Sequence, residues 1–202
     1  MARTGRPRLF DRDEAVHKAM ALFWQYGYES TSLAQLREAM GGISAASFYA
    51  AFSSKESLFD EAIQLYLDTS GEQLRNILRD PTLDTATAIS TALKSALTKQ
   101  TESNHPSGCM VVLSATNCSP HNQHIQQTMA KEREQTRLAF QDCIQRGIGA
   151  CFLSAGTDAE SLSLFFSTLL NGISIQARDG LNLDKLNTLI DSTVSQLLAH
   201  AR

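Results

Sequence analysis

The segment TSLAQLREAMGGISAASFYAAF, residues Thr31 to Phe52, decides how the rest of this chain is interpreted. Leu33, Leu36 and Met40 recur at helical spacing, so the first half is predicted to bury one face of a helix. Gly41-Gly42 interrupts that helix, and Ser44 is a suitable N-cap for a second, short one. Two short helices joined by a tight turn form the motif that places its second helix in the DNA major groove. An ordinary helical hairpin would show the same pattern, so the flanking sequence has to separate the two.

Charge is distributed unevenly along the chain. The 202 residues carry a net charge of −3, and 43% of them are hydrophobic, which is enough for a substantial core. Residues 1–12 nevertheless carry a net charge of +3, from four arginines and one aspartate. Arg3, Arg6 and Arg8 therefore form a basic arm, which we expect to enter an adjacent minor groove of DNA. The alternative for the arm is a solvated tail.

Several classes of protein are disfavoured by what the sequence lacks. There is no apolar run long enough to span a membrane, and no apolar segment follows the basic N-terminus to make a secretory signal. The four cysteines have no CxxC spacing, so we expect reduced thiols and a cytoplasmic protein. We find no nucleophile–base set, phosphate-binding glycine loop or cofactor motif, so we do not expect an enzyme.

Two further helices are predicted to flank the opening segment. Asp11 is the expected N-cap of the first, which ends at Gly27. Ser53 is the expected N-cap of the other, which continues to about Arg79. Lys55 falls in its first turn, where it is placed to hold a phosphate beside free backbone N–H groups.

With these flanks included, residues 9–59 resemble the N-terminal domain of the TetR family of bacterial transcriptional regulators. The matching positions are Ala19, Phe23, Gly27-Tyr28, Thr31-Ser32-Leu33, Leu36, Gly42-Ile43-Ser44, Phe48-Tyr49, Phe52, Ser54-Lys55-Glu56 and Leu58. The resemblance implies an all-α fold with a three-helix DNA-binding domain over 1–53 and a connecting helix over 54–80. A larger effector-binding and dimerisation domain would follow over 81–202. One departure is an extra residue between Met40 and Ser44, which affects the geometry of the turn.

The resemblance also implies which residues contact double-stranded operator DNA. Tyr49, Lys55 and Thr31 would contact phosphates, and residues 44–47 would face the groove. The complete expected set is Arg3, Arg6, Arg8, Thr31, Ser32, Arg37, Ser44, Ala45, Ala46, Ser47, Tyr49 and Lys55.

The predicted recognition helix contains no Arg, Asn, Gln or Lys, the residues that make most bidentate base contacts. Ala45, Ala46 and Ala51 can instead pack on thymine methyl groups. We therefore hypothesise that specificity depends on methyl contacts, on Arg37 or Gln35, and on the arm together with DNA shape.

The second part of the chain reads as helices only. They are expected over 84–101, 108–117, 120–147, 162–175 and 183–199. The last two are too apolar for helices that face water on one side, so they are either core or a two-fold interface. The family resemblance favours a homodimer, which would suit palindromic half-sites.

An effector pocket is implied by the family resemblance, although plain core packing is an alternative for each candidate. The candidates are Phe59, Ile63, Tyr66, Met110, Leu113, Met129, Phe140, Phe165, Leu169 and Ile173. Cys109 follows Gly108 at a predicted helix start, where the helix dipole would lower the thiol pKa. It is therefore a candidate redox or electrophile sensor, or else an inert buried thiol. A metal site among His105, Cys109, Cys118, His121 and His124 lacks a tight thiolate pair and is not expected.

The leading hypothesis is a ligand-responsive regulator, a repressor that a small molecule releases from a palindromic operator. Alternatives are a cysteine-based redox regulator and an architectural DNA-binding protein without an effector.

Deletion of residues 2–8 should remove much of the DNA affinity and flatten sequence preference, because the alanine-rich helix depends on the arm. Binding assays at physiological salt on specific and random duplexes test this expectation. Unchanged binding by the deletion variant would exclude a role for the arm.

Overall fold

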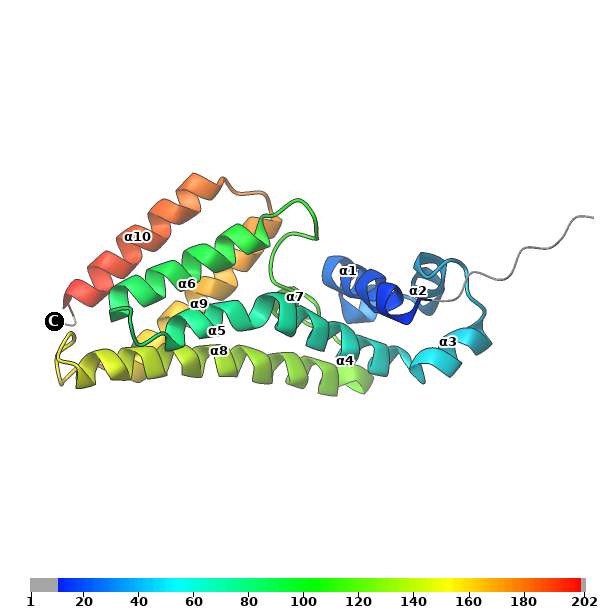
Figure 1. Ribbon diagram of the computed structural model, residues 1–202, viewed down its shortest axis with the longest axis horizontal. Coiled ribbons are helices and arrows are strands. Elements are labelled where there is room, and N and C mark those ends of the chain that lie inside the picture. Colours follow the sequence, from blue (N-terminus) through cyan, green and yellow to red (C-terminus); the bar gives the residue numbers. More distant parts are fainter. Residues whose placement is uncertain (1–10, 201–202) are drawn as a thin grey trace, which may run out of the picture.

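The computed structural model describes residues 11–200, and every regular element in that range is helical (Figure 1). The elements are α1 (Arg12–Ser30), α2 (Leu33–Ala39), α3 (Ala45–Phe52), α4 (Lys55–Tyr66), the π-helical η1 (Leu67–Gly71), α5 (Glu72–Arg79), α6 (Thr85–Gln100), α7 (Met110–Leu113), the 3-10 turn η2 (Pro120–Asn122), α8 (Gln123–Gly149), α9 (Ala159–Arg178) and α10 (Leu183–His200). The predicted all-α fold is confirmed. Helices α1 to α3 form a head at one end, and α4, η1 and α5 lead from it into the bundle.

Helix α1 begins as predicted, because the Asp11 carboxylate accepts the N–H groups of Asp13 and Glu14, both at 3.0 Å. Gly27 bends the helix instead of ending it: its φ is 80°, and the helix resumes as far as Ser30. The bend lets the Tyr28 N–H donate to the Ser114 carbonyl at 2.6 Å. A Cβ at position 27 would lie 3.2 Å from that carbonyl oxygen, so this close approach requires glycine.

The conformation of the turn between α2 and α3 accommodates the extra residue. Gly41 and Gly42 both have positive φ, 87° and 74°, and their N–H groups donate to the carbonyls of Glu38 and Arg37 at 3.0 Å. These bonds satisfy carbonyls at the end of α2. The Arg37 Nε then donates to the Ile43 carbonyl at 2.8 Å and spans the turn. Two consecutive left-handed residues therefore make room for the longer connection.

The predicted cap of α4 is wrong by one residue. Ser54, not Ser53, is the N-cap, and its hydroxyl accepts the Ser57 N–H at 2.9 Å. Ser53 lies in a γ-turn with φ 61° and ψ −46°, closed by the Ser54 N–H donating to the Phe52 carbonyl at 2.6 Å. Ser53 makes the sharp reversal between α3 and α4, so its neighbour Ser54 becomes the N-cap.

The expected helix over 54–80 is present as a continuous run to Arg79, but its middle is the π-helical η1. The expected helix over 108–117 is wrong in extent, because only α7 forms there. The residues on either side of α7 are held by contacts with other elements; for example, the Ser114 carbonyl accepts the Tyr28 N–H. Helices α6, α8, α9 and α10 lie where they were predicted, within a few residues at each end.

Two hydrophobic cores organise the molecule. The first joins the head to α4 and also takes Met110, Val111, Ala115, Ile125 and Met129 from α7, α8 and the connection between them. The second lies inside the bundle formed by α5, α6, α8, α9 and α10. Since the first core contains residues from both parts of the chain, the head is anchored on the bundle by apolar packing.

Gly42→Ala should destabilise the protein by roughly 1–2 kcal/mol, because an L-residue is strained at positive φ even where space is open. A Cβ at Gly42 would meet nothing within 4 Å, so the loss of stability would come from backbone strain and not from a steric clash. Gly149→Ala is the matched control, since its Cβ also meets open space but its φ is ordinary. Denaturant unfolding of both variants measures the difference, and equal stability would refute a strained turn.

Candidate DNA-binding surface and internal cavity

Helix α3 presents small residues and one aromatic ring to solvent. Residues 44–47 are exposed, and Tyr49 is 51% exposed. Phe48 and Phe52, on the other face, are buried in the first core. The Ser44 hydroxyl caps the helix by accepting the Ser47 N–H at 3.0 Å. The outer face can therefore approach a groove closely, with the Tyr49 ring available at its edge.

Lys55 lies at the first turn of α4, where the head meets the long helical run. It is half-buried, and its Nζ lies 4.4 Å from the centroid of the Tyr28 ring, a cation–π contact. Burial lowers the pKa of Lys55, while the Glu29 carboxylate acts in the opposite direction. The aromatic contact fixes the position of the ammonium group beside the α4 N-terminus.

The other predicted DNA residues divide into three groups. Ser32 is exposed as the N-cap of α2, and Arg37 is half-exposed with its Nε held by Ile43. Thr31 is 0% exposed, and its hydroxyl donates to the Gly27 carbonyl at 2.6 Å. That side chain stabilises the bend of α1 and does not reach the surface, so we remove it from the DNA-contacting set. Arg3, Arg6 and Arg8 lie outside the described residues.

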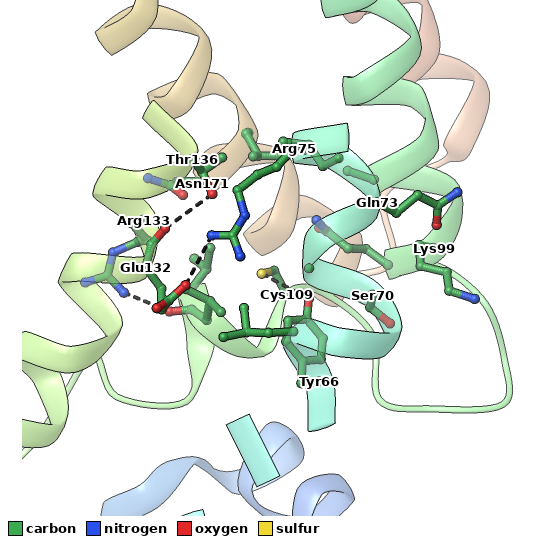
Figure 2. A pocket seen from close by; sticks show the side chains of 18 of the residues that line it. Tyr66, Ser70, Gln73, Arg75, Lys99, Cys109, Glu132, Arg133, Thr136 and Asn171 are labelled. Carbon is green, nitrogen blue, oxygen red and sulfur yellow. Dashed lines mark hydrogen bonds and ion pairs between the residues drawn. The ribbon is translucent and has the colours of Figure 1, made fainter. Parts of the chain in front are cut away.

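A cavity of about 70 Å³ lies inside the bundle, at the end where α1 of the head packs on it (Figure 2). Its walls come from α1, the run α4–η1–α5, α6, α7 with Cys109, α8 and α9. Figure 2 shows Arg75 reaching into its centre, with Glu132 and Arg133 on one side and Tyr66 with Cys109 below. The apolar walls include Trp24, Leu67, Leu74, Val111, Val112 and Leu170. An apolar chamber with a few polar groups is typical of a small-molecule site.

Cys109 lines this cavity, and the Tyr66 hydroxyl donates to its Sγ at 3.2 Å. Burial raises the pKa of the Cys109 thiol, while hydrogen bonds from Tyr66 and from the backbone at Val112 and Val111 act in the opposite direction. The prediction that a helix dipole lowers this pKa is therefore wrong in sign. Helix α7 has only four residues, too few to outweigh burial.

Of the ten predicted pocket residues, Tyr66 alone lines this cavity. Phe59, Ile63, Met110 and Met129 belong to the first core, Phe140 and Ile173 to the second, Leu113 and Leu169 are half-buried, and Phe165 is exposed. The sequence signal that was missed is polar: Ser70, Arg75 and Gln100 line the cavity, and Arg75 and Gln100 are buried on their helices. Polar residues on a buried face are more informative about a cavity than the apolar residues around them.

Comparison with known proteins identifies the family to which the head is similar. Residues 15–62 match the family model described as bacterial regulatory proteins, tetR family. The transcriptional repressor ComR of Escherichia coli (strain K12) is 32% identical over 190 residues, which cover 94% of this chain and 90% of ComR. The chain belongs to the TetR family.

Further relatives agree over nearly the whole length. The repressor BdcR of Escherichia coli (strain K12) is 30% identical over 182 residues, covering 90% of this chain and 86% of BdcR. Among solved structures, a cysteine mutant of the TetR-family regulator CifR, complexed with 26-bp operator DNA, has a TM-score of 0.87 at 38% identity. That similarity covers 95% of this chain and 98% of the CifR chain.

As a TetR-family member, the protein is a DNA-binding transcriptional regulator, and α2–α3 is its helix-turn-helix. Among the described residues, no helix is long and apolar enough to cross a membrane. Within the same part of the chain, no group of three or more His, Cys, Asp or Glu side chains is arranged to hold a metal ion.

Proposed function

We propose that this TetR-family protein represses transcription as a cytoplasmic homodimer on a palindromic operator, and that a small molecule in the cavity releases it. One observation carries the proposal: the run from Lys55 to Arg79 connects the DNA-binding surface with the cavity. Its first turn holds Lys55 beside α3, and its middle, η1, supplies Leu67, Ser70 and Gly71 to the cavity wall.

The π-helical η1 is the element that can respond to a ligand. Insertions of this kind occur at functional sites, because a wider turn leaves the helical hydrogen bonds less regular. A ligand that prefers one geometry of η1 shifts the population toward that geometry. The α4 end of the run then changes the spacing of the two recognition helices in the dimer. Release requires only that the ligand binds the DNA-incompetent spacing more tightly.

A second connection joins the cavity wall to α1. The Trp24 indole N–H donates to the Gly108 carbonyl at 3.1 Å, next to Cys109, and Trp24 itself lines the cavity. The Tyr28 N–H is bound to the Ser114 carbonyl on the other side of α7. A displacement of the segment around α7 is therefore transmitted to α1, which packs on α4 inside the first core.

The relatives support the direction of regulation. ComR and BdcR are both named as transcriptional repressors, and CifR was solved with operator DNA. These properties belong to those proteins, and we extend them to this chain because the similarity covers both the head and the bundle.

Exposed apolar side chains on the last two helices support the homodimer. Leu164 and Ile175 on α9 are 57% and 48% exposed, and helical spacing places them with Gly172 along one stripe. Leu189 on α10 is also exposed. Two copies of such a surface can bury each other around a two-fold axis.

Leu164→Glu or Ile175→Glu should weaken the dimer at least roughly tenfold, because each buries a charge in an apolar interface. Sedimentation equilibrium measures the change. Phe152→Ser is the control, since Phe152 is exposed but lies outside α9 and α10. Undisturbed dimers in both glutamate variants would place the interface elsewhere.

Genomic footprinting, repeated with cell extract added, tests the proposed function directly. The wild-type protein should occupy palindromic sites and leave some of them when extract is present. Ser70→Leu fills space in the cavity and should bind the same sites but resist release. Asn76→Leu, exposed on α5 outside the cavity, should behave as the wild type. Release of Ser70→Leu at the wild-type extract concentration would contradict a ligand in this cavity.

The redox alternative is favoured by one observation, the position of Cys109 in the cavity wall. In the same footprinting experiment, Cys109→Ser should still be released if the ligand binds non-covalently. Resistance of Cys109→Ser, together with release of the wild type by mild peroxide, would establish the redox mechanism instead. Absence of release under every condition would indicate an architectural DNA-binding protein.

A further inference from the structure

We infer that the cavity selects a small, uncharged molecule that carries a hydroxyl group on an apolar body. The inference rests on the proposed function, because it names the class of effector for the same cavity. It is carried by two buried polar atoms that line the cavity without partners among the described residues, the Arg75 Nε and the Gln100 Oε1.

The first atom is a donor. Arg75 is 6% exposed, and its two terminal nitrogens are engaged by Glu72 and by Glu132, the latter at 3.2 Å. Its Nε–H remains without an acceptor. A buried N–H without a partner is unfavourable, so a ligand oxygen that accepts from it gains a full hydrogen bond.

The second atom is an acceptor. Gln100 is 6% exposed at the end of α6, and its backbone carbonyl accepts the Gly108 N–H at 2.8 Å. That bond fixes the backbone beside the cavity while the side-chain Oε1 has no donor. A hydroxyl group both accepts and donates, which is the chemistry that the Arg75 Nε–H and the Gln100 Oε1 require between them, whereas a ketone can only accept.

The charged groups around the cavity are already paired within the protein, which disfavours an ionic ligand. The three cations that line it are Lys99, Arg75 and Arg133. Each of them already has a partner: Arg75 pairs with Glu72 and Glu132, Lys99 lies 3.0 Å from Glu102, and Arg133 donates to the Val111 carbonyl at 2.7 Å. Because these cations already have partners within the protein, a carboxylate ligand would have to displace one of them, and an ammonium group would meet cations in the wall, so neither would recover the cost of leaving water.

The chain carries its own probe of occupancy, because Trp24 is the only tryptophan in the sequence and lines the cavity. Full-length protein is titrated with four-carbon probes of similar size, namely 2-butanol, 2-butanone, butyrate and butylamine, and Trp24 fluorescence is followed. We expect 2-butanol to bind tightest and 2-butanone roughly tenfold more weakly, because the ketone leaves the Gln100 Oε1 unpaired. The two ions should not bind measurably.

Gln100→Leu tests whether the Gln100 Oε1 itself produces the preference for the alcohol, which a general change in structure would not remove selectively. It removes the acceptor, so the preference for 2-butanol over 2-butanone should fall to about twofold or less, while the ketone still binds through Arg75. Gln145→Leu is the matched control, exposed on α8 outside the cavity, and should keep the tenfold preference. Equal affinities in the wild type, a preference retained in Gln100→Leu, tighter binding of either ion, or no binding by any probe would overturn the inference.

The outcome is separable from that of the proposed function. Release of operator sites by extract without the probe preference refutes only the ligand chemistry. The probe preference without any release by extract refutes the proposed function and leaves the binding site intact.

Discussion

The packing of α1 against α4 is the constraint on which the rest of the structure depends. At their crossing, the Phe59 ring meets the rings of Phe23 and Tyr28 edge-on, each at a centroid distance of 5.1 Å. Such aromatic pairs contribute about 0.5–1.5 kcal/mol beyond the area they bury. They fix the head on the helical run that enters the bundle. The Lys55 ammonium group lies over the Tyr28 ring, so the same cluster positions a charge at the DNA-facing end.

This arrangement makes the head and the bundle mechanically dependent on each other. Trp24 and Tyr28 of α1 are bound to the segment around α7, and α4 continues through η1 into the cavity wall. Two routes therefore lead from the cavity to one aromatic cluster. Because packed interiors are dense and respond in discrete rearrangements, we expect a small change at η1 to shift the head and not to be absorbed locally.

The sequence predicted those features that local chemistry determines. Asp11 and Ser44 cap helices as their side chains require, and apolar spacing located the long helices within a few residues. Features set by tertiary contacts were not predictable. Contacts with neighbouring elements determine the backbone conformation at the Ser53 γ-turn, the short α7 and the π-helical η1. The cavity was misplaced for a related reason: helical periodicity shows that a face is buried, but not whether the partner face fills it.

The recognition helix shows how turn geometry and groove contact are linked. Ser44 and the first turn of α3 (Ala45, Ala46 and Ser47) carry no long side chain, so base contact through this turn requires the backbone to lie close to the bases. Close approach demands an accurate angle between α2 and α3. That angle is set by the Gly41-Gly42 turn and by the Arg37 guanidinium on the Ile43 carbonyl. Arg37 thus has a structural role in the turn that orients the short side chains at the start of α3.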